Sequence, residues 1–488
     1  HNKGSTVDTK GARQTTVAWE NFYEFTGTTL KDFPLPKALP LERARTLDAL
    51  AQELSAQQVA ALVEAQAPTA ELLVSAEAAQ ASLKRRMIAQ QEELDWEVYQ
   101  SYGLLDDALV YAGEPPEVAL GERAFEIVLA RAMSAGAEDT AWFERHGSTP
   151  ITEIPAHWPA DYRDLVQRRI DAIESVDAIR LLEKPEYKRR WASESFAKQA
   201  DAALRAWLLD KLEDRDLWFS RQGHPTPLSI SQLADRLGRD ETFTSVIDLW
   251  KGQRDADLVR ALTDLLEPEA VPYLAAMRLK DTGLRKFAAW QHTWALQRQE
   301  DAMRPSTSSG NKLAEPVEAP RNDPSTSSGN DKANARADAF AQTIPVPPKY
   351  ALADFRKPAY WAARGKLDVP KERFILYPDA GRDTDPTLLL GWAGWDHAQQ
   401  SLALATLIAS RRDEGADDAR LIPLVAGMAE LQPWVEQWHA DVDLQFGVSP
   451  ASFCGETLRG HQQALGVTTA ELDAWRPTPT TRGRKARR

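Results

Sequence analysis

The stretch that decides the fold is Leu83-Lys-Arg-Arg-Met-Ile-Ala-Gln-Gln-Glu-Glu-Leu-Asp-Trp-Glu-Val98. Its apolar residues recur at the spacing of one face of an α-helix. The same pattern extends from Pro68 to about Tyr102, where Gly103 offers a helix stop. About 32 residues rising 1.5 Å each would form a rod of roughly 48 Å. The predicted apolar stripe consists of Leu83, Met87, Leu94 and Val98.

The segment before this helix shows the same periodicity over residues 41–66. Ser55 and Gln58 fit a capping box, which predicts that a new helix begins before Val59. We expect the segments 41–66 and 68–102 to pack as an antiparallel helical hairpin. The apolar positions of the first segment include Leu47, Leu50 and Leu54.

Residues 104–300 are also predicted to be mostly helical. Prolines mark the breaks, many Ala, Leu, Glu and Arg residues lie between them, and no two-residue alternation persists. Residues 230–250 have the spacing of a helix-turn-helix, with Gly238 at the turn. Its second helix carries Asp240 and Glu241, which phosphates would repel. A plain helical hairpin is therefore favoured, and a DNA-reading motif is the alternative.

The C-terminal part adds a little β-structure. Phe374–Tyr377 and Leu388–Leu390 are short apolar runs that could pair as a hairpin around a polar loop. Helices are predicted to follow, one capped by Asp396 and the last opened by a capping box of Thr468 and Glu471. The predicted fold class is mainly α: a helical multi-domain chain with a small mixed α/β C-terminal unit.

A repeated polar segment divides the chain. Pro305-Ser-Thr-Ser-Ser-Gly-Asn311 recurs intact as Pro324-Ser-Thr-Ser-Ser-Gly-Asn330. Neither copy contains apolar mass that could offset the entropy of ordering it, so we predict a disordered insert over 305–332. The predicted flanking domains are a helical domain with the long hairpin at 41–304 and a mixed α/β domain with a basic tail at 333–488.

Composition bounds the class of protein. The chain has 488 residues, of which 43% are hydrophobic and 27% charged, so we expect several globular domains. No stretch approaches the roughly 20 apolar residues of a membrane span. The net charge of −13 argues against a dedicated nucleic-acid binder without excluding one basic face. The single Cys454 excludes internal disulfides and suits the reducing cytoplasm, where we place the protein.

Catalytic and metal-binding signals are scarce. No Gly-x-Gly-x-x-Gly opens a predicted helix, no Walker sequence occurs, and the eight histidines show no zinc-ligand spacing. We therefore predict no catalytic and no metal-binding residue. Trp290 with Trp294, and Trp434 with Trp438, lie one helical turn apart, which favours helix packing over base stacking.

Two flexible basic segments are the candidates for DNA contact. Polar residues beside Gly4 and Gly11 could follow a phosphate backbone, and the tail after Thr481 is strongly basic. The alternatives are an ordinary surface loop for the first segment and solvated disorder for the tail. The candidate DNA-binding residues are Lys3, Lys10, Arg13, Arg482, Arg484 and Lys485.

Two sequence blocks carry a family resemblance. One is Trp19-Glu-Asn-Phe-Tyr-Glu-Phe-Thr-Gly-Thr28, followed by Phe33-Pro-Leu-Pro36; the other is Arg85-Arg-Met87, followed by Gln91-Glu-Glu-Leu-Asp-Trp-Glu-Val-Tyr99. Together they resemble the C-terminal part of large adenine-specific DNA methyltransferases, and more narrowly the PglX methyltransferases of type 2 BREX phage-defence systems. Further matching blocks are Leu120–Glu126, Trp142–Thr149, Pro185–Trp191 and Leu389–His397.

The resemblance implies transfer of a methyl group from S-adenosylmethionine to adenine N6 by the parent enzyme. In that family the flipped base enters a pocket lined by Asn/Asp-Pro-Pro-Tyr/Phe, and this sequence contains no such motif. The chain opens at His1 without an initiator Met, and four aromatic residues crowd positions 19–25. We therefore expect the catalytic and cofactor residues upstream of His1, with residues 1–40 as the end of a target-recognition region.

Two functions follow as expectations. In the first, the chain is the non-catalytic C-terminal portion of the methyltransferase and binds no cofactor itself. Its partners are then double-stranded DNA, through the parent enzyme, and other phage-defence proteins, and it contacts no membrane. In the second, it is a helical protein–protein interaction scaffold without a direct DNA role, which the acidic balance and the long hairpin favour.

The repeated insert yields a test. Deleting residues 305–330 should leave the melting temperature nearly unchanged, because neither copy of the repeat has apolar mass to contribute to a core. The measurement is thermal unfolding of the full chain with and without the deletion. A drop of many degrees would show that the segment is part of a folded unit.

Overall fold

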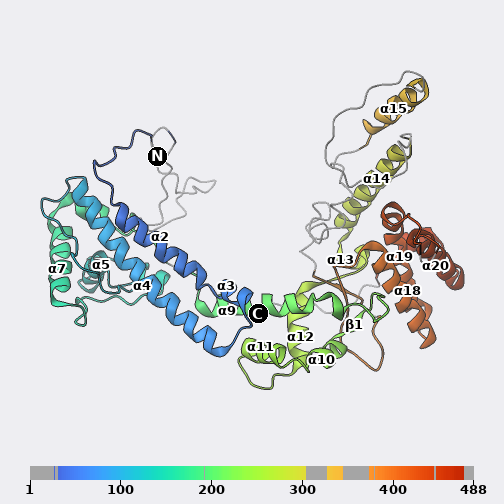
Figure 1. Cartoon of the computed structure of the whole chain (residues 1–488), viewed down its shortest axis with the longest axis horizontal. Coiled ribbons are helices and arrows are strands. Elements are labelled where there is room, and N and C mark those ends of the chain that lie inside the picture. Colours follow the sequence, from blue (N-terminus) through green and yellow to red (C-terminus); the bar gives the residue numbers. More distant parts are fainter. Residues whose placement is uncertain are drawn as a thin grey trace. The chain divides into compact units, whose positions relative to one another are not determined.

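The computed structural model describes residues 27, 31–191, 193–303, 327–344, 373–378, 380–444 and 447–477. Its described residues are mostly helical, and four short strands form one mixed sheet, so the predicted fold class is confirmed (Figure 1). The chain divides into two compact units, His1–Trp207 and Leu208–Arg488. Within the described residues, no helix has both the length and the apolar character needed to cross a membrane.

The first unit opens with the predicted helical hairpin, and α2 and α4 lie side by side in Figure 1. Its direction follows from two hydrogen bonds at opposite ends of the pair. Arg43 Nε donates to Glu97 Oε2 over 2.7 Å, and Gln80 Nε2 donates to the Gln57 carbonyl over 2.8 Å. The helices are therefore antiparallel, as predicted. Their bounds are α2 (Leu41–Ala56), α3 (Val59–Ala65) and α4 (Ala70–Ser101).

The predicted capping box of Ser55 and Gln58 is wrong. A helix does begin at Val59, but its N-cap residue Gln58 makes no side-chain capping bond. The Gln58 amide instead donates to the Leu54 carbonyl, back along α2. The amide is thus bound to the preceding helix end, which local spacing does not reveal.

Of the helices after α4, α9 packs with α3 in a small apolar cluster, and the others share one larger apolar core with α4. Trp96 and Tyr99 of α4, and Trp142, Trp158 and Tyr162 of the later segments, are buried there. Trp158 meets Tyr162 in a T-shaped contact at 5.2 Å, which is a favourable aromatic geometry. The helices are α5 (Ala124–Ser134), α6 (Trp142–His146), α7 (Ala160–Ser175), α8 (Asp177–Leu182) and α9 (Phe196–Leu212).

The second unit contains the sheet, whose strand order is β1-β4-β3-β2. β3 and β4 pair antiparallel with Leu376 opposite Leu390, which confirms the predicted hairpin. β2 pairs parallel to β3, and β1 pairs antiparallel to β4. The strands are β1 (Leu228–Ser229), β2 (Ala270–Pro272), β3 (Phe374–Leu376) and β4 (Leu389–Trp392).

Strands from both sides of the repeated insert therefore belong to one unit, whereas the predicted domains end and begin at the insert. Residues 305–326 of the insert lie outside the described residues. Helix α15 (Ser327–Ala341) begins inside the range 305–332 for which disorder was predicted. Alanines at every second position from Ala333 to Ala341 give this segment a high helix propensity.

The helix-turn-helix spacing corresponds to two real helices, α10 (Ile230–Leu237) and α11 (Glu241–Lys251). Asp240 is the N-cap of α11 and accepts hydrogen bonds from the Thr242 and Phe243 amides. The acidic residue thus has a local structural role. The buried faces of the two helices are made by Ile230, Leu233 and Leu237, and by Phe243, Val246 and Ile247.

Several local predictions for the later helices are confirmed. Asp396 caps α18, and Thr468 with Glu471 forms the capping box of α21. Trp294 and Trp434 meet at 5.5 Å in a T-shaped contact inside a small core cluster, so this pair packs helices. The other helices are α12 (Leu258–Leu266), α13 (Ala275–Arg278), α14 (Asp281–Met303), α18 (His397–Asp413), α19 (Asp418–Trp438), α20 (Pro450–Leu465) and α21 (Thr469–Ala474); two short 3-10 turns cover Arg215–Leu217 and Glu267–Glu269.

The sheet leaves no room for a side chain at Gly391. A Cβ there would lie 2.5 Å from the Trp395 ring and 2.9 Å from the Tyr377 ring. Gly391→Ala should therefore destabilise the second unit by about 1–3 kcal/mol through overpacking. Gly460→Ala is the matched control, because Gly460 is an exposed glycine in α20 with no atom within 4 Å of its Cβ position. It should stabilise by about 0.5–1 kcal/mol. Urea unfolding compares the two, and equal effects would contradict this packing.

Candidate functional site

Charged residues gather inside the first unit on one turn of α4. Glu92 and Glu93 are almost fully buried, although they stand in a helix between apolar positions. Burial of an ionised carboxylate is costly unless cations and hydrogen bonds compensate it. Two buried cations meet these carboxylates, Arg169 at Glu93 and Lys188 at Glu92. A third buried cation, Arg123, pairs with Glu126 of α5.

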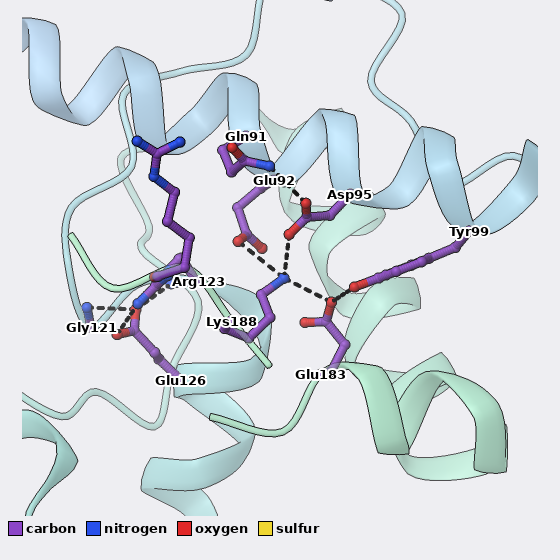
Figure 2. A network of polar contacts seen from close by, with 10 residues as sticks. Gln91, Glu92, Asp95, Tyr99, Gly121, Arg123, Glu126, Glu183 and Lys188 are labelled. Carbon is purple, nitrogen blue, oxygen red and sulfur yellow. Dashed lines mark hydrogen bonds and ion pairs between the residues drawn. The ribbon is translucent and has the colours of Figure 1, made fainter. Parts of the chain in front are cut away.

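Lys188 is the centre of the largest group, and Figure 2 shows its ammonium pointing between three carboxylates. Its Nζ lies 2.7 Å from Asp95 Oδ2, 2.8 Å from Glu183 Oε1 and 3.4 Å from Glu92 Oε1. Tyr99 donates its hydroxyl to the same Glu183 oxygen over 2.7 Å. The ammonium thereby joins α4 to the segment that follows α8.

The protonation states follow from burial and from these neighbours. Burial raises the pKa of Glu92 to about 7, against the attraction of Lys188, which lowers it. Burial by itself would lower the pKa of Lys188, but Glu183 and Glu92 outweigh it and hold the pKa well above its ordinary value. Burial also raises the pKa of Tyr99, and the Glu183 charge adds to this. Lys188 is therefore a permanent cation and not a nucleophile.

A second buried pair fixes the start of α5. Arg123 binds Glu126 through two parallel hydrogen bonds of 2.9 and 2.8 Å, the geometry of a strong guanidinium–carboxylate pair. Glu126 also accepts from the Gly121 amide and from the Trp142 indole. The remaining Arg123 nitrogen, Nη1, donates to the Arg189 carbonyl over 3.0 Å. The second pair is thus tied to the same segment that carries Lys188.

The third buried ion pair joins α7 to α4. Arg169 of α7 binds Glu93 over 2.7 Å and also donates twice to the Leu109 carbonyl. Its guanidinium stands 5.4 Å from the Trp96 ring centroid, a cation–π contact. Glu93 accepts from the Tyr111 amide as well. The Lys188 and Arg169 groups therefore fix separate chain segments on α4, and the Arg123 pair links the start of α5 to the segment that carries Lys188. The chemistry of all three is positional.

The sequence did not reveal these residues. The predicted stripe placed Leu94 and Val98 toward the core, yet both are only half-buried, whereas Glu92, Glu93 and Trp96 are buried. α4 is covered on more than one side, so its buried surface is wider than one stripe. The one signal in the sequence was the presence of the carboxylates Glu92 and Glu93 within the apolar pattern of the long helix.

None of the predicted DNA-binding residues can be placed, because Lys3, Lys10, Arg13, Arg482, Arg484 and Lys485 all lie outside the described residues. Those six assignments stay predictions. Among the described residues, no group of three or more His, Cys, Asp or Glu side chains has the arrangement of a metal site. Cys454 is buried in a small apolar cluster of the second unit.

The second unit contains two open clefts of about 500 and 460 Å³. The first is lined by residues that include Phe287, Arg298 and Trp434, and the Arg298 guanidinium lies 4.5 Å from the Trp434 ring centroid. The second includes Asp385, which accepts from the Ser231 and Thr387 hydroxyls. The hydrogen bonds to Asp385 hold the loop between β3 and β4 in place.

The Lys188 group makes a sharp prediction. Lys188→Met removes the one ammonium that faces three carboxylates, so it should destabilise the first unit by about 3–5 kcal/mol. Lys184→Met is the matched control, since Lys184 is exposed and only four residues away; its effect should stay within about 0.5 kcal/mol. Urea unfolding of both variants measures the difference. Two effects of similar size would show that Lys188 is not a structural anchor.

Comparisons with known proteins place the chain in a family. The model of a family described as a domain of unknown function, DUF7008, matches residues 87–486. The adenine-specific methyltransferase PglX of Streptomyces coelicolor is 45% identical over 488 residues, which cover 99% of this chain and 37% of the relative. The chain thus spans little more than a third of that relative's length. No solved structure matches it. The predicted resemblance to PglX-type adenine-specific methyltransferases is confirmed, and the chain belongs to the DUF7008 domain family.

Proposed function

We propose that this chain is the non-catalytic, C-terminal portion of a DNA adenine-N6 methyltransferase of bacterial phage defence, and that it positions DNA and contacts partner proteins. The observation that carries the proposal is the 45% identity over 99% of the chain to a PglX methyltransferase more than twice as long. The Asn/Asp-Pro-Pro-Tyr/Phe motif that would hold a flipped adenine does not occur in the 488 residues.

The proposal divides the reaction between two parts of one enzyme. The remainder of the parent protein would bind S-adenosylmethionine and transfer its methyl group to adenine in the cytoplasm. This chain would supply a stiff body against which the duplex, or another phage-defence protein, is held. Proximity and orientation contribute much of an enzyme's rate, and a rigid support is what they require.

The internal structure of the first unit suits such a role. The cations Arg169 and Lys188 are buried with carboxylate partners from distant parts of the sequence, Glu93 and Asp95 of α4. A segment that leaves its place would abandon a charge in an apolar interior, at a cost of several kcal/mol. The surface of the unit is therefore held in one arrangement, as a positioning module needs.

The first test is chemical. The purified chain, mixed with tritiated S-adenosylmethionine and duplex DNA, should transfer no methyl group, and calorimetry should detect no binding of S-adenosylmethionine. The same chain should bind duplex DNA with an affinity that falls steeply as salt increases. Methyl transfer by the chain alone would refute the division of labour.

The DNA measurement also separates the two candidate functions. If the chain binds no duplex even at low salt, the helical interaction scaffold becomes the better description. A matched control is the chain after removal of residues 305–326, which end before α15 and carry few basic residues. This deletion should leave the salt dependence unchanged, so a change would point to a folding defect.

A further inference from the structure

We propose that the first unit takes up one proton when it folds, that Glu92 holds this proton in the charge cluster around Lys188, and that the stability of the unit therefore falls as the pH rises toward neutrality. The inference does not depend on the proposed function. It rests on three carboxyl groups that surround a single buried ammonium, as Figure 2 shows.

The charges of this cluster do not balance without the proton. The carboxyl groups of Glu92, Asp95 and Glu183 meet one ammonium, that of Lys188. The neighbouring Arg123 guanidinium does not supply the missing positive charge, because its own carboxylate partner on α5 neutralises it through two hydrogen bonds. With all three carboxyls ionised, the cluster would carry two uncompensated negative charges. A buried carboxyl group in that position binds a proton instead.

The ion-pair distances single out Glu92. Its oxygen lies 3.4 Å from the ammonium nitrogen, whereas the Asp95 and Glu183 oxygens lie at 2.7 and 2.8 Å. The Glu92 side chain is only 4% exposed, so water does little to stabilise its charged form. Of the three groups, Glu92 therefore receives the weakest compensation for a negative charge.

The other two carboxylates have further support as anions. Asp95 accepts a hydrogen bond from the Gln91 amide over 2.8 Å, and its side chain is 24% exposed. Glu183 accepts from the Tyr99 hydroxyl over 2.7 Å. Its second oxygen, Oε2, is buried and receives no hydrogen bond from the described residues. The cluster is thus short of donors as well as of positive charge, and a protonated carboxyl group adds one donor.

The direction of the pH dependence follows from burial and from the charges that face Glu92. Burial is the main cause that raises its pKa to about 7, and Glu183 and Asp95 add to the increase. Lys188 and Arg123 act in the opposite direction. The ordinary pKa of a glutamate is 4.5. Between these two values the folded state keeps the proton and the unfolded state has lost it, so stability falls as the pH rises. Above this range both states are ionised and this dependence ends.

Urea unfolding of the full chain at pH values from about 5.5 to about 8.5 tests the inference. Pulsed hydrogen exchange at one fixed pH, read by mass spectrometry of α4 peptides, reports on the first unit alone. Between about pH 5.5 and about pH 7.5 the unfolding equilibrium constant should rise on the order of tenfold. Glu92→Gln is neutral at every pH, so it should lack this rise and be more stable than the wild type at about pH 7.5.

The matched control is Glu77→Gln, which changes an exposed glutamate of the same helix α4. It should keep the pH dependence of the wild type. If Glu92→Gln shows the same dependence as the wild type, the proton is not held on Glu92 and the inference is overturned. If Glu92→Gln is less stable than the wild type at every pH, Glu92 is an ionised partner of Lys188, which overturns it equally.

Infrared difference spectroscopy of the folded chain detects the proton without relying on stability. The wild type at about pH 6 should show the carbonyl band of a buried protonated carboxyl group, and the band should disappear at about pH 8.5. Glu92→Gln should lack it. No such band in the wild type would show that the cluster is fully ionised. A band that persists in Glu92→Gln would place the proton on another carboxyl group. Either result contradicts the assignment to Glu92.

Discussion

The ammonium of Lys188, buried between Asp95, Glu92 and Glu183, is the constraint on which the first unit depends. A charge moved from water into an apolar interior is unstable unless opposite charges surround it closely. Here the compensating groups come from α4 and from the end of α8, so neither part can move without exposing the imbalance. One interaction thereby fixes the register between a long helix and a segment far along the chain.

This constraint also fixes the residues next to Lys188 in the sequence. A buried lysine sets the place of its neighbours, and Arg189 and Arg190 follow it directly in the sequence. The cation that stabilises the interior and the cations exposed to solvent therefore belong to one Lys-Arg-Arg run.

The second unit is organised by different physics. Its sheet takes β1 and β2 from before the repeated insert and β3 and β4 from after it. Aromatic rings fill its interior. The ring centroid of Trp218 lies 5.6 Å from that of Phe374 and 6.3 Å from that of Trp395. Apolar packing and short backbone ladders hold this unit, and its two clefts are lined by residues engaged within the same chain.

The sequence by itself determined the elements whose signals are local. Helical periodicity located α4, short apolar runs located the pair β3 and β4, and side-chain caps located the starts of α18 and α21. Only the tertiary structure decided that Glu92 and Glu93 are interior, that Gln58 turns back to α2, and that β1 and β2 join the sheet. Each of these depends on a partner that local spacing does not specify, such as Lys188 for Asp95, 93 residues away. Periodicity records which face of a helix is apolar, whereas the pairing of buried charges is set by the three-dimensional meeting of distant segments.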